Sequence, residues 1–212
     1  MHAVALRSGE FAGRLDLLKR MFRLRRRVFK DRLGWDVSSS DGMEIDVFDA
    51  LGPTYLLALA GHDDVVGCVR LLPTMGPTML GETFPSLLNG QPLPRDPNVL
   101  ESSRFCVDTG RGANTLGGGL SQVTFMLFAA MIEHLSSVQA RSIVTVTDLR
   151  MERILRRAGW PLQRIAAPKA IGNTMALAGY LHGSEPALSA ICQHADLERP
   201  VLRGAASTCE AR

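Results

Sequence analysis

The apolar residues near the start of the chain recur at helical spacing, which predicts an amphipathic helix over residues 14–30. The apolar stripe consists of Leu15, Leu18, Phe22 and Phe29. Arg25 lies on this stripe too, three residues after Phe22 and four before Phe29. A buried guanidinium costs several kcal/mol unless carboxylates pair with it. The pattern therefore predicts either an acidic partner inside the protein or an Arg25 side chain that reaches water along the edge of the stripe.

Further along, apolar and β-branched runs predict a hairpin followed by alternating strands and helices. The hairpin strands cover residues 54–60 and 65–72, and Arg70 shares one face of the second strand with Val66, Cys68 and Leu72. The other predicted strands are residues 103–107, 142–147, 163–166 and 175–181, and the other predicted helices are residues 120–137, 149–158 and one that begins at Ser184.

The order of these elements predicts the fold class. A central hairpin and a later alternation of strands and helices favour one three-layer α/β/α domain with a mixed sheet. Residues 73–97, rich in proline and glycine, predict a surface excursion with a helical turn over 83–88. We find no repeat or linker in the sequence, so the domain is expected to span residues 1–199, with a frayed tail over 200–212.

Composition and charge argue against several classes of protein. Of the 212 residues, 46% are apolar and 21% are charged, as in globular proteins, and the net charge of +3 gives little reason to expect nucleic-acid binding. The sequence has no apolar run of about 18 residues, so no membrane span is expected. The N-terminus lacks a signal-peptide pattern, which favours a cytoplasmic protein.

Cysteine and histidine spacing argues against a metal site. The four cysteines, Cys68, Cys106, Cys192 and Cys209, form no C-x-x-C pair and are expected to be reduced thiols. The histidines show neither H-x-x-x-H nor H-E-x-x-H spacing. We therefore expect no bound metal.

Three acids and three arginines fall on separate predicted elements. The set is Arg25, Asp46, Asp49, Arg70, Glu101 and Arg104. If these side chains converge, they suit a zwitterionic ligand, because carboxylates hold an ammonium group and arginines hold a carboxylate. The spacing alone also allows unrelated surface pairs, each contributing little to stability.

Two further segments have possible binding chemistry. Residues 110–119 form a glycine-rich loop before a helix, where backbone amides can hold a phosphate or pyrophosphate, although a flexible connection is the commoner explanation. Arg150, Arg153 and Arg157 recur three and four residues apart. They predict a basic stripe that is either a solvated face or a docking surface for an acidic partner protein.

Four segments have a specific combined spacing. They are Leu24–Trp35, Asp41–Asp49, Arg70–Thr74 and Glu101–Phe105. Through them the chain, from about residue 3 to residue 181, closely resembles the LuxI-type acyl-homoserine lactone synthases, which make quorum-sensing autoinducers. The resemblance implies a fold like that of the GNAT acyltransferases, with a mixed twisted sheet between helices. It also implies two substrates, S-adenosylmethionine and a fatty acyl chain on acyl carrier protein, and no resident cofactor.

The resemblance also implies roles for individual residues. The implied catalytic set is Glu101, Asp46, Arg25, Asp49, Arg70 and Arg104. The implied S-adenosylmethionine-binding set is Phe29, Trp35, Arg25, Asp46 and Arg104, with the two aromatic rings as walls of the pocket.

The reaction needs a base, because the methionyl amine must lose a proton before it attacks the acyl thioester. Glu101 is our first choice for the base and Asp46 our second. The methionyl carboxylate then attacks its own γ-carbon, which closes the lactone and releases methylthioadenosine.

The acyl chain requires an apolar tunnel. By resemblance its lining is Ser102, Phe125, Phe128, Thr145, Thr147 and Met151. Thr145 occupies the position where, in this family, a threonine accompanies 3-oxoacyl substrates, since its hydroxyl can hydrogen-bond a β-keto oxygen. The alternative is a strand threonine that bonds to the backbone.

Other functions stay open at this point. Acyl-CoA is an alternative donor because it carries the same phosphopantetheine, although the stripe of Arg150, Arg153 and Arg157 favours the acidic carrier protein. A plain GNAT N-acetyltransferase explains the order of elements but not the set of acids and arginines. A nucleic-acid binder is disfavoured because aromatic residues make up only 6% of the chain and no binding motif is visible. We expect a monomer or a weak dimer.

Overall fold

The computed structural model describes residues 1–110, 115–116 and 120–203. The strands of its main sheet are β1 (His2–Leu6), β4 (Thr54–Ala60), β5 (Asp64–Pro73), β6 (Val99–Val107), β9 (Ser142–Asp148), β10 (Gln163–Arg164), β11 (Lys169–Ile171), β12 (Thr174–His182) and β13 (Leu202–Arg203). The α-helices are α1 (Leu15–Arg26), α2 (Met79–Glu82), α3 (Gln122–Ser137), α4 (Leu149–Arg157) and α5 (Glu185–Ala195). The short elements are the strand pairs β2 (Ser39–Ser40) with β3 (Met43–Glu44) and β7 (Thr115–Leu116) with β8 (Leu120–Ser121), the 3₁₀ turns η1 (Ser8–Arg14), η3 (Val47–Ala50) and η4 (Pro85–Leu88), and the π-helix η2 (Arg27–Arg32).

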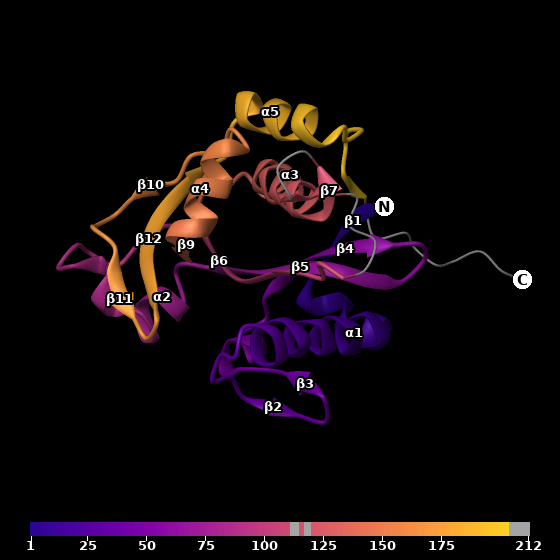
Figure 1. The fold of residues 1–212 in the computed structure, drawn as a ribbon, viewed down its shortest axis with the longest axis horizontal. Helices are drawn as coiled ribbons and strands as arrows, with labels where there is room; N and C mark the ends of the chain where they lie inside the picture. The colour runs from indigo at the N-terminus through magenta and orange to yellow at the C-terminus, as the bar shows by residue number, and fades with distance from the viewer. Residues whose placement is uncertain (111–114, 117–119, 204–212) are drawn as a thin grey trace, which may run out of the picture.

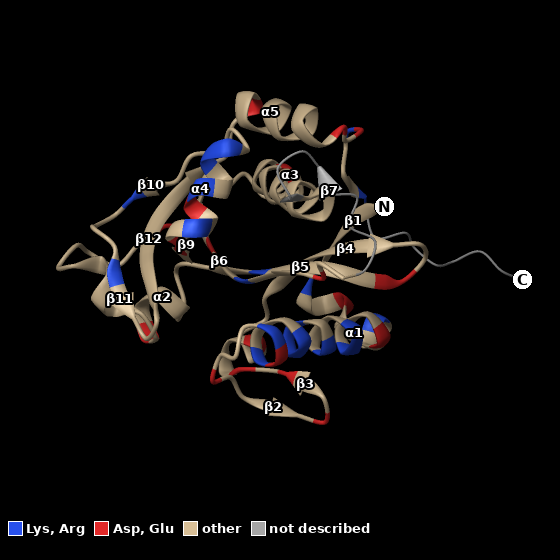
Figure 2. Ribbon diagram, in the orientation of Figure 1, with Lys and Arg blue, Asp and Glu red and all other residues tan. Residues whose placement is uncertain are grey.

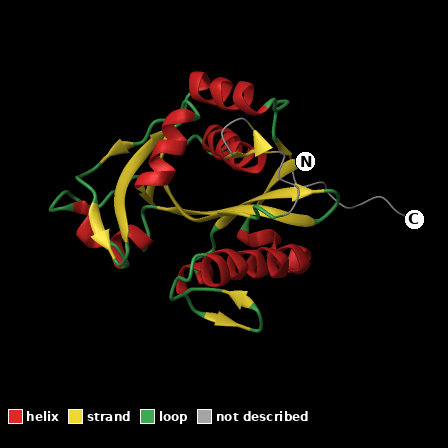
Figure 3. Ribbon diagram, viewed as in Figure 1, coloured by secondary structure: helices red, strands yellow, loops and turns green. Residues whose placement is uncertain are grey.

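The main sheet separates two layers of helices. Its strand order is β10-β12-β9-β6-β5-β4-β1-β13, with β11 paired to β12. The β6–β9 and β1–β13 pairs are parallel and the other pairs are antiparallel, so the sheet is mixed. Figures 1 and 3 show α3, α4 and α5 over one face and α1 with the small β2–β3 hairpin below the other. This architecture confirms the predicted three-layer fold.

Each face of the sheet has its own core. The α3 side packs residues of the sheet against residues of α3, α4 and α5, including Phe128, Leu155, Trp160 and Ile191. α3 is buried almost all round because it lies between the sheet and α5, which explains why its sequence is apolar rather than amphipathic. The α1 side is a smaller core in which Met21 and Leu24 are fully buried.

A β-bulge in the hairpin alters one predicted face. Leu59 pairs with Val65 and Ala58 pairs with Gly67, which leaves Val66 as the extra residue of β5. Val66 packs into the α3 core, whereas Cys68 packs into the α1 core. The prediction that Val66 shares the face of Arg70 is therefore wrong, because strict alternation ends at the bulge.

Element boundaries differ from the predictions where tertiary contacts decide them. The first helix continues as η2 to Arg32, two residues beyond its predicted end. The predicted fraying from residue 200 does not hold for residues 201–203. Val201 is buried, and β13 pairs in parallel with β1 while Glu133 accepts the Leu202 N–H at 2.8 Å.

Among the described residues, we find no helix with both the length and the apolar character needed to cross a membrane.

Candidate functional site

Arg25 is fully buried between two carboxylates. Its Nε donates to Glu44 Oε2 at 2.5 Å, and Nη1 and Nη2 donate to the two oxygens of Asp49 at 2.8 and 2.9 Å. Its side chain is 0% exposed, so it does not reach water along the stripe. The predicted acidic partner inside the protein is confirmed.

A tight turn after β3 presents the acids. Asp46 precedes η3 and accepts the Phe48 N–H at 2.9 Å, while Asp49 accepts the Asp46 N–H at 2.8 Å. This reciprocal capping fixes both carboxylates relative to the backbone. Glu44, on β3, is the innermost acid of the segment and is fully buried.

Two arginines from the sheet complete the network. Arg70, on β5, donates from Nη1 to Asp46 at 2.5 Å and to Asp49 at 2.8 Å. Arg104, on β6, donates from Nε to Glu44 at 2.9 Å, and its Nη2 lies 2.7 Å from Asp46 Oδ2. These contacts bring together five of the six predicted charged residues, all but Glu101, and exclude unrelated surface pairs among them.

The backbone at Arg104 is unusual. Its φ is +54°, a left-handed value that β-strand residues other than glycine rarely adopt. Arg104 and Phe105 lie opposite the single residue Val69, between the Arg70–Ser103 and Cys68–Cys106 pairs. This bulge breaks the alternation of β6 and directs the guanidinium toward Glu44.

The network favours the charged forms of Arg25 and Asp49. Burial alone would raise the pKa of Asp49, but the hydrogen bonds and charge of Arg25, together with Arg70, hold it well below its usual range. Burial alone would likewise lower the pKa of Arg25, and Asp49 and Glu44 instead raise it above its ordinary value. The Tyr55 hydroxyl donates to Asp49 Oδ1 at 2.7 Å, and burial and this carboxylate raise the Tyr55 pKa.

Glu101 lies at the edge of the network and is 1% exposed. Its two oxygens accept the N–H groups of Met79 and Leu80 at 2.8 and 2.7 Å, so it holds the first turn of α2. Burial raises the pKa of Glu101, while these N–H groups and Arg70 oppose the rise. The pKa of Glu101 is thus shifted upward, whereas that of Asp49 is shifted downward.

Asp46 Oδ2 has acceptor capacity to spare. It is buried and forms an ion pair with Arg104 Nη2 at 2.7 Å, but it accepts no hydrogen bond from the described residues. The side chain is 15% exposed, against 0% for Glu44 and 4% for Asp49. Asp46 is therefore the most accessible of these three acids.

The predicted aromatic residues stack on each other beside the network. Phe29 and Trp35 have ring centroids 5.2 Å apart and an interplanar angle of 11°. The Arg104 guanidinium lies over the Phe29 ring at 5.6 Å. Phe29 is buried and Trp35 is 48% exposed, so the pair extends from the network to the surface. The π-helix η2 sets this geometry by shifting the side chains after Arg27 out of α-helical register.

The residues expected to line the acyl tunnel belong to the α3 side of the sheet. Ser102 and Thr145 are the last pair of the β6–β9 ladder, and Thr145 Oγ1 donates to the Ser102 carbonyl at 3.2 Å. Phe128 is buried against Phe125 and Trp160, and Thr147 and Met151 are half-buried. The backbone hydrogen bond of Thr145 is the alternative that the sequence left open, and the tunnel itself stays a prediction.

The basic stripe lies on the outer face of α4. Arg150, Arg153 and Arg157 are all exposed, and Figure 2 shows the blue basic positions along this helix. Met151 and Ile154 pack toward the α3 core, as the spacing predicts. The stripe is thus turned outward, on the opposite layer from α1.

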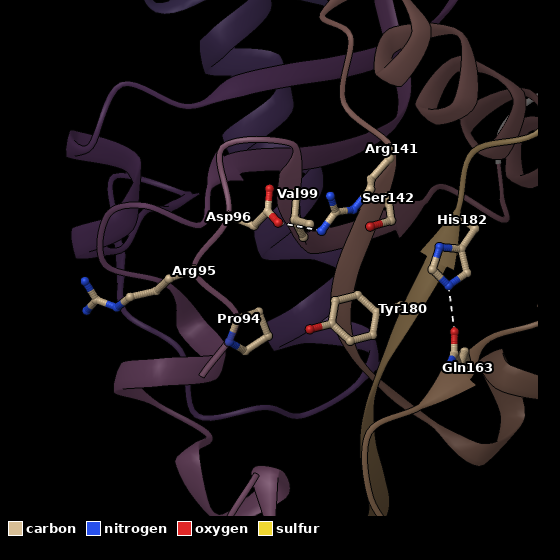
Figure 4. A pocket seen from close by; sticks show the side chains of 9 residues that line it. All are labelled: Pro94, Arg95, Asp96, Val99, Arg141, Ser142, Gln163, Tyr180 and His182. Carbon is tan, nitrogen blue, oxygen red and sulfur yellow. Dashed lines mark hydrogen bonds and ion pairs between the residues drawn. The ribbon is translucent and has the colours of Figure 1, made fainter. Parts of the chain in front are cut away.

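Other predicted or possible sites fall elsewhere. Of the glycine-rich loop, residues 111–114 and 117–119 lie outside the described residues. A cavity of about 390 Å³ lies at the far end of β9 and β12 and is lined by Arg95, Arg141, Tyr180 and His182, among others (Figure 4). It includes no residue of the predicted sets.

Within the described part of the chain, no group of three or more His, Cys, Asp or Glu side chains could hold a metal ion.

Four residues of the network lie outside the predicted site sets. Glu44 bridges Arg25 and Arg104, Tyr55 bonds to Asp49, and the Ser103 hydroxyl accepts from Arg70 Nε at 3.0 Å. Met79 contacts two arginines through its sulfur. The sequence does point to Glu44, because it begins residues 44–49, a segment with three acids that follows the helix of Arg25 and can supply its acidic partner. The other three are uncharged residues at positions that only the fold brings to the site.

Comparisons with known proteins agree with this geometry. The family model described as autoinducer synthase matches residues 10–191. A protein of Sinorhizobium fredii strain NGR234, described as a probable acyl-homoserine-lactone synthase, is 52% identical over 78% of this chain and 80% of its own length.

Two solved structures share the fold of this chain. The CoA-dependent acyl-homoserine lactone synthase BjaI, crystallised with S-adenosylmethionine and isopentyl-CoA, has a TM-score of 0.84 at 25% identity and covers 96% of this chain and 92% of its own. A protein assigned as an N-acetyltransferase of Lactobacillus plantarum shares the fold alone, with a TM-score of 0.56 at 16% identity over 87% of this chain and all of its own. The matched segment includes all three arginines and all four carboxylates described above, and the chain therefore belongs to the autoinducer synthase family, the acyl-homoserine-lactone synthases.

Proposed function

We propose that the charged network is the site where the amine of S-adenosylmethionine accepts a fatty acyl chain and where the product closes to an N-acyl-homoserine lactone. The observation that supports this most is the convergence of Arg25, Arg70 and Arg104 on the acids of the β3–η3 turn. BjaI is an acyl-homoserine lactone synthase whose structure contains S-adenosylmethionine, which supports the same substrate for this chain.

The charge balance suits this substrate. Three arginines face four carboxylates, counting Glu101, so the site has one net negative charge when all groups are ionised. S-adenosylmethionine has a sulfonium, an ammonium and a carboxylate, and therefore one net positive charge. Complementary charge of this kind raises the local concentration of a ligand.

We assign the proton transfer to Glu101 first and to Asp46 second. Each Glu101 oxygen accepts one N–H, which leaves lone pairs that can accept from a water or an amine. Asp46 Oδ2 has acceptor capacity to spare. After deprotonation the nitrogen forms a bond to the acyl carbonyl carbon and the thiolate leaves. The methionyl carboxylate then forms the bond to its γ-carbon, and the γ-carbon–sulfur bond breaks to release methylthioadenosine.

We place the phosphopantetheine arm of the donor where β6 and β9 part. Their ladder ends at Ser102 and Thr145, beyond which β6 pairs only with β5 and β9 only with β12 within the described residues. Backbone groups on the facing edges are then available to the amides of an extended arm, as in strand addition. The acyl chain would continue among the tunnel residues, and a 3-oxo group would reach Thr145 if its hydroxyl turns away from Ser102.

The reaction itself is the first test. The purified chain should release methylthioadenosine from S-adenosylmethionine only when an acyl donor is present, and mass spectrometry should detect the matching acyl-homoserine lactone. A panel of acyl carrier protein and acyl-CoA donors of different length separates the two donor classes. If no donor of either class gives methylthioadenosine, the proposed function is wrong.

The donor class has its own test, because the α4 stripe suits an acidic carrier protein. Changing Arg153→Glu and Arg157→Glu together should raise KM for the carrier-bound donor about tenfold or more and leave KM for acyl-CoA unchanged. The matched control is Arg20→Glu with Arg23→Glu, two exposed arginines on α1, on the other layer of the fold. An equal rise in KM for both donors, or for both variants, would argue against docking at α4.

A further inference from the structure

The side chain of Met79 lies between two arginines of the charged network. Its Sδ is 3.1 Å from Arg70 Nη2 and 3.4 Å from Arg104 Nη1, so N–H groups from β5 and β6 point at one sulfur atom from α2. The same residue donates its backbone N–H to Glu101 at 2.8 Å. Met79 is thus an uncharged residue that touches three of the charged ones.

The other nitrogens of both guanidiniums face oxygen atoms. Arg70 uses Nε for Ser103 and Nη1 for Asp46 and Asp49, and Arg104 uses Nε for Glu44 while its Nη2 lies beside Asp46. A thioether is a weak acceptor, whereas guanidinium groups prefer carboxylates. Among the described residues, Arg70 Nη2 and Arg104 Nη1 are therefore the donors of the network with the weakest acceptor, the Met79 sulfur.

The Met79 side chain is flexible but packed. It has three rotatable bonds, and the carboxylates hold both guanidiniums without it, but it is buried in a cluster with Phe48 and Leu72. Its backbone stays fixed by Glu101 and by Thr78, whose hydroxyl accepts the Gly81 N–H at 3.2 Å at the start of α2. A turn of the side chain on this fixed backbone therefore breaks its contacts with Phe48 and Leu72, and an entering ligand has to replace them.

We propose that Met79 is the displaceable cover of a carboxylate subsite formed by Arg70 Nη2 and Arg104 Nη1. This inference rests on the proposed function. When S-adenosylmethionine binds, its α-carboxylate replaces the Met79 sulfur as the acceptor for these two nitrogens. The amine would then lie toward Asp46 Oδ2, the acceptor with capacity to spare on the neighbouring carboxylate. Met79 would in this way set the affinity for the carboxylate end of the substrate and not for its adenosine.

Two substitutions of similar size separate this role from a structural one. Met79→Gln provides a stronger acceptor for the same two donors, so it should compete with the substrate and weaken S-adenosylmethionine binding about tenfold. Met79→Leu provides no acceptor and should tighten S-adenosylmethionine binding at least twofold. Methylthioadenosine, which lacks the carboxylate, should bind both variants within about twofold of wild type. Calorimetric titration gives all of these dissociation constants.

The control is Met75→Gln, an exposed methionine four residues before Met79 in the turn that precedes α2, which should leave both ligands unaffected. The subsite is disproved if Met79→Leu weakens S-adenosylmethionine as much as Met79→Gln does, or if methylthioadenosine weakens in parallel. A wild-type protein that binds neither ligand would instead show that the proposed function, and the subsite with it, is wrong.

Discussion

Replacing Arg25 with methionine is expected to abolish turnover and to lower the free energy of unfolding by about 3–5 kcal/mol. The substitution leaves Glu44 without one of its two arginines and removes both hydrogen bonds of Arg25 to Asp49. Both acids are almost completely buried, so water cannot replace the lost partner. Urea unfolding and the methylthioadenosine assay measure the two effects.

The matched control is Arg23→Met, two residues away on the exposed side of α1, which should change the unfolding free energy by less than about 0.5 kcal/mol. Adding Glu44→Gln to Arg25→Met removes one of the uncompensated charges and should recover part of the loss. An Arg25→Met protein as stable as wild type would mean that the buried network contributes little to folding.

Changing Glu101 to glutamine is expected to lower kcat at least about 100-fold, the usual contribution of a positioned base. The side-chain amide cannot accept both the Met79 and Leu80 N–H groups, so the unfolding free energy should also fall by about 1–3 kcal/mol. A rate assay at temperatures where the variant is fully folded keeps the two effects apart.

The pH profile distinguishes a base from a structural cap. Burial raises the pKa of Glu101, so the ionised form that accepts a proton becomes populated only above the usual range of a glutamate. The wild-type rate should therefore rise with pH through this raised pKa, and the residual rate of Glu101→Gln should lack that rise. Glu101→Asp should keep it at a lower rate. If Glu101→Gln turns over at the wild-type rate while Asp46→Asn does not, Asp46 is the base.

The sequence by itself predicted the main strands and helices of the fold well. Period-2 and period-3.6 patterns identified the β4–β5 hairpin, the first and third helices and β9, because each has a stretch of buried positions long enough to outweigh local exceptions. β6 was predicted four residues too short at its start. The unpredicted start includes the polar residues Glu101 and Ser102, which enter the sheet because β5 and β9 pair with β6 on both sides.

The sequence also determined that Arg25 needs an acid, because a guanidinium on an apolar stripe has no other stable arrangement once it is buried. Only the tertiary structure decided which acids meet it. Glu44 and Asp49 are 19 and 24 residues away, and Arg104 reaches Glu44 across 60 residues through a bulge that no alternation pattern predicts. The contact of Met79 with two arginines likewise depends on how a short helix packs against two strands, and an uncharged side chain gives no sign in the sequence of the charges it will touch.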